Sequence, residues 1–286
     1  MFSRRRKFGP PAKSAWAKRV FAALASSIAV LLLLPLGAFA GAGAAAAAPN
    51  PDLETVLNGS RQRIEKLDYR ISGRITKVDA GGKRTNYKLL AKAHWFPDGL
   101  LLLSVISGPG TDKTSLLVHM TATGKLTIEA MLPGAKASSV VPFEHWNDPV
   151  VGTDFSYEDM VEDQFFWKDQ ELQPSQKFGT RDCFVLKSAS GPQDRTNYSS
   201  VTSWIDRSII FPVQVVKTLR GGQQKQFLYY GLRQTSGTWS ASQIEAKSPG
   251  KPGSSMLVIE GGTPKANLTR KNFDLSQPTA PAQPAK

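Results

Sequence analysis

The residues that most suggest chemistry form an acidic window, Asp154 to Asp163, which holds five carboxylates and no basic residue. Paired carboxylates can act as general acid and base, and clustered ones can bind a divalent cation. A calcium loop needs alternating acids around a central glycine, however, and a catalytic pair must face one cavity. Helical numbering instead places Glu158, Asp159 and Glu162 on the same side as Asp163. The pattern therefore predicts a solvated acidic face and not a site.

The same segment carries the signature of a helix start. Ser156 and Asp159 have the spacing of a capping box, in which the serine accepts a backbone N–H bond and the acid reaches back. The acids near the start of such a helix are favoured by its dipole. The side opposite the acids is apolar and comprises Tyr157, Met160, Val161 and Phe165. We therefore expect function on the apolar side.

Searches for other reactive motifs find none in the sequence. It contains no G-x-S-x-G, no H-E-x-x-H, no Walker loop and no paired C-x-x-C. The three histidines, His94, His119 and His145, are scattered along the chain. We predict no catalytic residue, no metal site, no cofactor and no enzymatic activity. A hydrolase with an unrecognised catalytic triad is a distant alternative.

The first forty-eight residues have the composition of an export signal. A basic segment without acids, Met1 to Arg19, precedes the apolar run Val20 to Ala40. That run ends in Ala38-Phe39-Ala40, the small-x-small pattern of a signal-peptidase site. We predict a cleaved signal peptide over residues 1–48 and a periplasmic protein. Sec and twin-arginine export both stay open, as does an uncleaved inner-membrane anchor.

Removal of that signal changes the electrostatic interpretation. Seven of the 36 basic residues lie in residues 1–40, which leaves 29 against 23 acids and a net charge of about +6. Such a charge gives weak attraction to anionic membrane surfaces and does not indicate nucleic acid as a partner. Cys183 is the only cysteine, so no intramolecular disulfide forms, and its apolar neighbours predict a buried strand position. Since no cysteine lies near the cleavage site, we predict that the protein is not lipidated.

Beyond the signal, hydrophobic periodicity predicts one helix followed by strands. Apolar residues at helical spacing begin after Pro49, whereas Tyr69 to Thr76 and Asn86 to Trp95 alternate with period two. Glycine and proline turns then separate strand-sized segments, which favours an antiparallel sheet. Those segments are 116–121, 126–131, 184–187, 201–206, 213–219, 227–232 and 256–260. We predict one domain over residues 49–275 and a disordered Pro/Ala-rich tail over 276–286.

The stretch Gly152 to Asp159, "GTDFSYED", resembles a signature of the outer-membrane lipoprotein-sorting proteins, the LolA-like family. The order Trp204-Ile205-Asp206, then Pro212, then Gly221-Gly222 is similar to the downstream pattern of that family. The resemblance covers about residues 49–273. It implies a mainly β fold with a few helices, in which a strongly curved antiparallel sheet, an incomplete β-barrel, carries a helical lid.

The resemblance also implies a function. A carrier of this kind binds acyl chains of a lipid or lipoprotein in an apolar cavity and transfers them to the outer membrane. Its partners would include an inner-membrane transporter or an outer-membrane acceptor, with transient membrane contact. The chain departs from the family at Lys92 to Trp95, where LolA carries an Arg-Pro pair, which leaves other lipids open, as in LppX-like carriers. The alternative function is an envelope stress-sensing or interaction module without cargo, as in RseB-like proteins.

Alternation along the strands and the lid suggests which residues line the cavity, although each of them could instead be ordinary core. The candidate lipid-binding residues on the sheet are Ile71, Ile75, Leu89, Trp95, Leu102, Leu116, Val118 and Ile128. Those on the lid are Tyr157, Met160, Val161 and Phe165. A register error of one residue would turn a whole strand outward.

Overall fold

The computed structural model describes residues 51–110 and 113–276. The predicted signal peptide and nearly all of the predicted tail lie outside these residues. Within the described part, no helix is long and apolar enough to cross a membrane.

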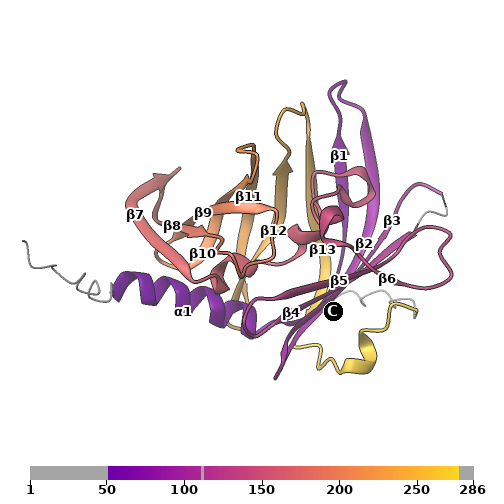
Figure 1. Cartoon of the computed structure of the whole chain (residues 1–286), viewed down its shortest axis with the longest axis horizontal. Helices are drawn as coiled ribbons and strands as arrows, with labels where there is room; N and C mark the ends of the chain where they lie inside the picture. Colours follow the sequence, from indigo (N-terminus) through magenta and orange to yellow (C-terminus); the bar gives the residue numbers. More distant parts are fainter. Residues whose placement is uncertain (1–50, 111–112, 277–286) are drawn as a thin grey trace, which may run out of the picture. The chain divides into compact units, whose positions relative to one another are not determined.

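One helix and one sheet make up most of the described chain (Figure 1). The helix α1 spans Pro51–Glu65. The first six strands are β1 (Asp68–Val78), β2 (Arg84–Phe96), β3 (Gly99–Ser107), β4 (Lys113–Thr121), β5 (Leu126–Met131) and β6 (Ser139–Val140). The other seven are β7 (Asp169–Phe178), β8 (Arg181–Ala189), β9 (Tyr198–Asp206), β10 (Phe211–Leu219), β11 (Gln224–Thr235), β12 (Thr238–Lys247) and β13 (Ser254–Pro264). The predicted fold class, a strongly curved and open antiparallel sheet, is confirmed.

The strand order determines where the connecting chain must run. The described strands form a single sheet in the order β6-β5-β4-β3-β2-β1-β13-β12-β11-β10-β9-β8-β7. Consecutive strands β6 and β7 therefore lie at its two opposite edges. The chain between them, residues 141–168, has to cross the whole sheet, and it does so over one face (Figure 1). We call residues 141–168 the lid segment and the face that it covers the inner face.

Alternating side chains form the main apolar core between the inner face and the lid segment. Ile75 of β1, Leu89 of β2 and Leu102 of β3 are buried in it, as the period-two pattern predicts. Gly73 interrupts the apolar phase of β1 because β13 approaches closely at a bulge. A Cβ at Gly73 would lie 2.2 Å from the carbonyl oxygen of Val258. The backbone contact therefore requires glycine there.

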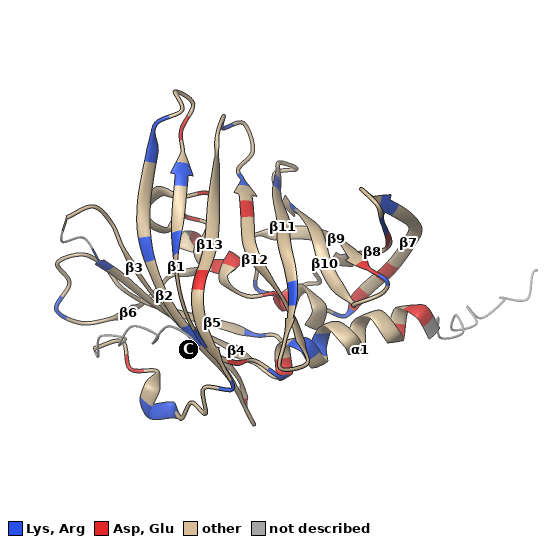
Figure 2. Ribbon diagram, turned by 180° about the vertical axis from the view of Figure 1, so that it is seen from behind, with Lys and Arg blue, Asp and Glu red and all other residues tan. Residues whose placement is uncertain are grey.

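The outer face of the sheet is divided between charge and a second apolar cluster. Arg70 and Arg74 of β1 stand opposite Lys92 and Lys88 of β2, and blue residues mark both strands in Figure 2. Farther along, the chain after β13 packs back onto β3. This second cluster contains Leu101, Leu103, Leu268, Phe273 and Leu275. Because β3 is covered on both faces, the run from Leu100 to Ile106 is buried throughout and apolar except at Ser104.

The helix and most strands agree with the sequence-based prediction. Gly59 is accommodated in the middle of α1, where a Cβ would lie 2.7 Å from Cγ2 of Ile210. Cys183 is buried in β8. The edge strand β7 was missed because its sequence is mostly polar and contains Pro174, beside a register irregularity at which the ladder is interrupted.

Candidate functional site

The lid segment is a series of short turns of 3-10 helix and not one amphipathic helix. Its helices are η1 (Phe143–His145), η2 (Val150–Gly152), η3 (Tyr157–Met160) and η4 (Asp163–Phe166). Val161 separates the last two, with extended backbone angles of φ −133° and ψ 165°. The prediction of a continuous helix through the acidic window is therefore wrong. The start of η3 does form where predicted.

The capping interaction at Ser156 is confirmed in an altered form. The Ser156 backbone N–H donates to Oδ2 of Asp159 at 2.9 Å, as a capping box requires. The Ser156 hydroxyl also donates to Oδ2 at 2.6 Å. Ser156 thus directs the Asp159 carboxylate as well as beginning the turn.

The acidic window faces the sheet and not the solvent, which corrects the predicted solvated face. Asp154, Glu158 and Asp163 are 8%, 2% and 7% exposed, and the Asp159 side chain is 0% exposed. The reason is that basic and hydrogen-bonding groups distant in sequence reach the window from the sheet and from α1. The acids fasten the lid segment to the rest of the fold.

Asp159 forms the centre of a buried ion cluster with two strands. Its Oδ1 accepts from Nζ of Lys217 in β10 at 3.0 Å, and its Oδ2 accepts from Nζ of Lys225 in β11 at 2.6 Å. The two lysine side chains are 7% and 6% exposed. The Tyr198 hydroxyl of β9 also donates to Oδ1, at 2.8 Å. We call Asp159, Lys217, Lys225 and Tyr198 the latch.

The latch keeps its charges despite burial. Burial alone would raise the pKa of Asp159, but the charges of Lys225 and Lys217 outweigh it and hold that pKa well below its usual range. Burial would lower the pKa of Lys217, whereas the neighbouring Asp159 and Asp163 raise it. Burial and the Asp159 charge raise the pKa of Tyr198 well above its usual range. Carboxylate and Lys217 ammonium are thus both charged at neutral pH.

Two further acids anchor the lid segment at its sides. The Ser255 hydroxyl of β13 donates to Asp154 at 2.7 Å, and the Asp154 backbone N–H donates to the same hydroxyl at 2.9 Å. Glu162 pairs with Arg63 of α1 at 2.7 Å. Nearby, Nε of Arg61 donates to the carbonyl of Phe165 at 2.8 Å. Both the sheet and the helix therefore fix the path of the lid segment.

The remaining two acids of the window, Glu158 and Asp163, are buried without a basic partner in hydrogen-bond contact within the described part of the chain. The Thr196 hydroxyl and the Asn197 backbone N–H donate to one oxygen of Glu158, whose other oxygen has no partner among the described residues. Burial raises the pKa of Glu158. Asp163 accepts from Nε1 of Trp167 at 3.1 Å, and burial raises its pKa to about 7. Asp163 therefore titrates near neutral pH.

The predicted lipid-binding residues lie together in the main apolar core. Eight are buried, namely Ile75, Leu89, Leu102, Leu116, Val118, Ile128, Val161 and Phe165. The other four, Ile71, Trp95, Tyr157 and Met160, are partly buried and pack against the same core. The strand phase is therefore as predicted. In the closed arrangement these side chains fill the inner face against the lid segment, and contact with a lipid stays a prediction.

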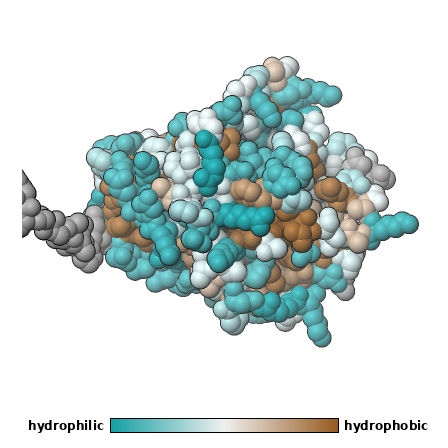
Figure 3. Space-filling model, viewed as in Figure 1, coloured by the Kyte–Doolittle hydropathy of each residue, from teal (hydrophilic) through white to brown (hydrophobic). Residues whose placement is uncertain are grey.

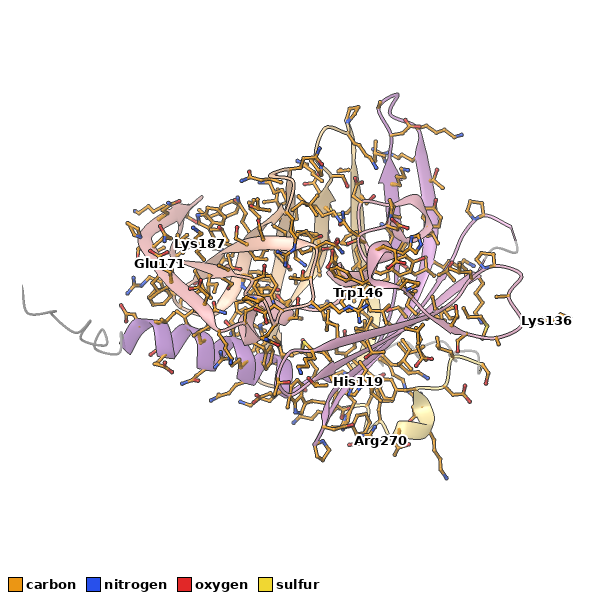
Figure 4. All side chains as sticks on the ribbon, viewed as in Figure 1. His119, Lys136, Trp146, Glu171, Lys187 and Arg270 are labelled. Atoms are coloured by element: carbon orange, nitrogen blue, oxygen red, sulfur yellow. The ribbon has the colours of Figure 1, made fainter. Side chains whose placement is uncertain are left out.

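Aromatic residues of the lid segment supply contacts that the sequence pattern did not identify. Phe166 stacks on Trp95, with centroids 6.0 Å apart and an interplanar angle of 15°. Phe155 lies 6.1 Å from Phe227 of β11. Trp146, also in the lid segment, is buried and donates from Nε1 to the carbonyl oxygen of Val141 (Figure 4).

A cavity of about 360 Å³ adjoins one end of this core. It lies between the lid segment, β2 and the two hairpin ends that follow β3 and β5. Its lining residues are Tyr87, Gly108, Pro109, Thr114, Leu132, Pro133, Val151 and Tyr157. Val151 has φ of 46°, which is strained for a β-branched residue. Of the twelve predicted lipid-binding residues, Tyr157 alone lines this cavity.

The histidines do not form a common centre. His94, His119 and His145 lie next to Asp68, Asp98 and Asp148 respectively. Within residues 51–110 and 113–276, no group of three or more histidine, cysteine, aspartate or glutamate side chains could hold a metal ion. The lid segment and the sheet instead form an apolar core that is closed by ion pairs and hydrogen bonds.

A family model described as an uncharacterized protein matches residues 113–277. No curated protein matches the sequence significantly.

The solved structures that resemble the fold include the following three. A domain from Vibrio parahaemolyticus, described as an outer membrane lipoprotein-sorting protein, has 20% identity and a TM-score of 0.66 over 78% of this chain and 97% of that chain. A DUF1329 family protein from Desulfovibrio piger has 16% identity and a TM-score of 0.66 over 78% and 98%. A LolA superfamily protein from Nitrosomonas europaea has 14% identity and a TM-score of 0.61 over 78% and 97%. At these identities the similarity shows a shared LolA-like fold.

Proposed function

Because the chain belongs to the family whose model matches residues 113–277 and has the LolA-like fold, we propose that it is a periplasmic, non-enzymatic carrier of acyl chains. It binds the chains of a lipid or lipoprotein between the inner face of the sheet and the lid segment, for transfer toward the outer membrane. One observation carries the proposal. The apolar inner face is covered by a segment that, beyond the backbone bond from Val141 to Ile128 at its start, is held by bonds that involve side chains and forms no strand of the sheet.

The chemistry of the interior supports an apolar ligand. Buried aliphatic and aromatic side chains form one continuous cluster across β1 to β4 and the lid segment. Each methylene that an acyl chain buries contributes about 0.8 kcal/mol, so partial enclosure gives useful affinity without a polar site. The adjoining cavity of about 360 Å³ lies within the usual size range of small-molecule sites, about 300–1,000 Å³. It offers a first position for the end of a chain.

The latch gives the carrier a means of opening. Every strong fastening of the lid segment described above joins a polar side chain to a strand or to α1, so rupture of these bonds frees the segment without unpairing the sheet. An acyl chain that is too long for the cavity then takes the place of lid side chains such as Phe165 against the inner face. The closed arrangement corresponds to the state without cargo.

Lipid extraction of the purified full chain, followed by mass spectrometry, tests the proposal. The carrier predicts a co-purifying acyl lipid, or saturable uptake of a dansyl-labelled fatty acid with a blue shift of its emission. Leu116→Glu places a charge in the buried inner face and should abolish uptake; Lys187→Glu, at an exposed position on β8, is the matched control. Circular dichroism of each variant separates lost binding from lost folding.

The alternative, an envelope interaction module, predicts a different result. A folded, lipid-free protein that takes up no fatty acid would refute the carrier. Recovery of one stoichiometric membrane partner by the same lipid-free protein would favour the module.

A further inference from the structure

The mouth of the cavity coincides with an exposed apolar projection. Within the described residues, only three large apolar side chains are strongly exposed, namely Leu132 at 48%, Val140 at 62% and Tyr230 at 39%. Two of them, Leu132 and Val140, are the first and last residues of the segment 132–140, which comprises the connection that follows β5 and the edge strand β6. Leu132 and Pro133 of this connection also line the cavity. We call residues 132–140 the tip.

The charge of the tip has one sign. Lys136 is its only ionisable residue, and it is exposed at the outer end of the connection (Figure 4). Lys113, at the start of the neighbouring strand β4, is also exposed. The nearest carboxylate on β5, Glu129, is half-buried and accepts from the Ser138 hydroxyl at 3.5 Å. The projecting surface is thus apolar and basic.

We propose that the tip docks on the surface of an anionic lipid bilayer, so that an acyl chain can pass directly between the bilayer and the cavity. The proposal deepens the proposed carrier function and rests on it for the transfer step. Apolar side chains enter the headgroup region, and the long lysine side chain keeps its ammonium among the anionic groups. Figure 3 shows apolar residues on the side where β5 and β6 lie, and others at the opposite end of the same face.

A bilayer fits the tip better than a folded protein partner. A stable protein interface takes about 20–30 residues from each side. The tip comprises nine residues and includes Pro133, Ala135 and Ala137, which offer little area for a specific contact. A lipid bilayer is fluid, so a narrow apolar projection beside the cavity can enter it without a surface of complementary shape.

A local fluorescent reporter tests docking in the full chain. Cys183 is buried, so a maleimide dye reacts at a cysteine introduced at the exposed Ala135. Vesicles of equal parts phosphatidylglycerol and phosphatidylcholine should shift the emission of this dye to the blue, and pure phosphatidylcholine should do so less. The same dye at Lys187 on β8, near the other end of the strand order, should not respond. The N-terminal segment is common to both proteins and does not affect this comparison.

Matched variants test the residues. Lys136→Glu should weaken the response to anionic vesicles by at least about fivefold, as expected for one basic residue near an anionic surface. Val140→Ser should weaken it on both vesicle types. Lys187→Glu and Tyr230→Ser, which change a lysine and an exposed apolar residue away from the tip, should leave it unchanged.

Several outcomes would overturn the docking proposal. These are an unresponsive Ala135 dye, an equal response at Lys187, or insensitivity to Lys136→Glu. A shift of the Ala135 dye on addition of unlabelled protein without vesicles would show a protein partner instead. Uptake of the dansyl fatty acid from solution tests the carrier function separately. Val140→Ser should slow transfer from vesicles while uptake from solution continues; failure of uptake in the unmodified chain would refute the carrier and leave the docking result standing.

Discussion

Asp159→Asn should destabilise the protein strongly because it leaves two buried ammonium groups without their counter-ion. The carboxylate is 0% exposed, with Lys217 at 3.0 Å and Lys225 at 2.6 Å. Asparagine preserves the shape and one acceptor oxygen but removes the charge. Removal of one partner from a buried ion pair costs about 3–5 kcal/mol. For a domain of this size, that loss corresponds to a fall in Tm of about 6–20 °C.

Urea unfolding followed by tryptophan fluorescence at pH 7.5 measures this loss. Asp169→Asn, at the exposed first residue of β7, is the matched control and should cost less than about 0.5 kcal/mol. A cost below about 1 kcal/mol for Asp159→Asn would refute the buried latch. The triple variant with Lys217→Met and Lys225→Met should recover most of the loss, since apolar groups replace a buried ion cluster at little cost.

Three further predictions concern the lid segment and the sheet that it covers. Because burial raises the pKa of Asp163 to about 7, the unfolded chain releases this proton at lower pH than the folded one. The free energy of unfolding of the unmodified protein should therefore fall as pH rises from about 4 to 7, by up to about 1.4 kcal/mol per pH unit from this group. Asp163→Asn should remove this fall, which urea titrations across that pH range measure. Ser156→Ala should cost about 1 kcal/mol in the same assay at pH 7.5, because Asp159 loses a donor and η3 loses its cap. Gly73→Ala should lower Tm in a thermal melt by more than Ser156→Ala does, since its Cβ would collide with the Val258 carbonyl; an unchanged Tm would show that the bulge relaxes.

Local patterns were sufficient for the strands but not for the lid segment. Period-two alternation gave the correct phase for β1 and β2, because each of these strands has one face against the main apolar core. The same local reasoning failed at Glu158 and Asp159. Because the window contains no basic residue, helical numbering predicted that these carboxylates face water. Burial of a charge depends on groups that the fold brings together, and local spacing does not contain that information.

A signal for the latch was nevertheless present in the strand sequences. Lys217 follows Val213 and Val215 in the inward phase of β10, and Lys225 precedes Phe227 in the inward phase of β11. A lysine in the apolar phase of a strand requires a buried partner. The acidic window contains no basic residue, and the two inward lysines have no acid close to them in sequence. The two sets of charges are therefore complementary. The cavity beside Tyr157, by contrast, depends on how two hairpin ends approach the lid segment, which no local pattern predicts.

The use of charges to hold the lid segment follows from the topology of the sheet. Because β6 and β7 occupy opposite edges, the chain between them must cross an apolar face without backbone pairing to the strands beneath it. Apolar contacts alone would leave its register undefined, whereas the bonds of Asp154, Asp159 and Glu162 join each carboxylate to particular partners on the sheet or on α1. A buried ion cluster also adds little net stability compared with apolar groups of the same volume, because its charges regain hydration when exposed. The latch therefore fixes where the lid segment closes. It also keeps the free-energy difference between the closed and open arrangements smaller than apolar residues in its place would. Reversible binding of an acyl chain requires both properties.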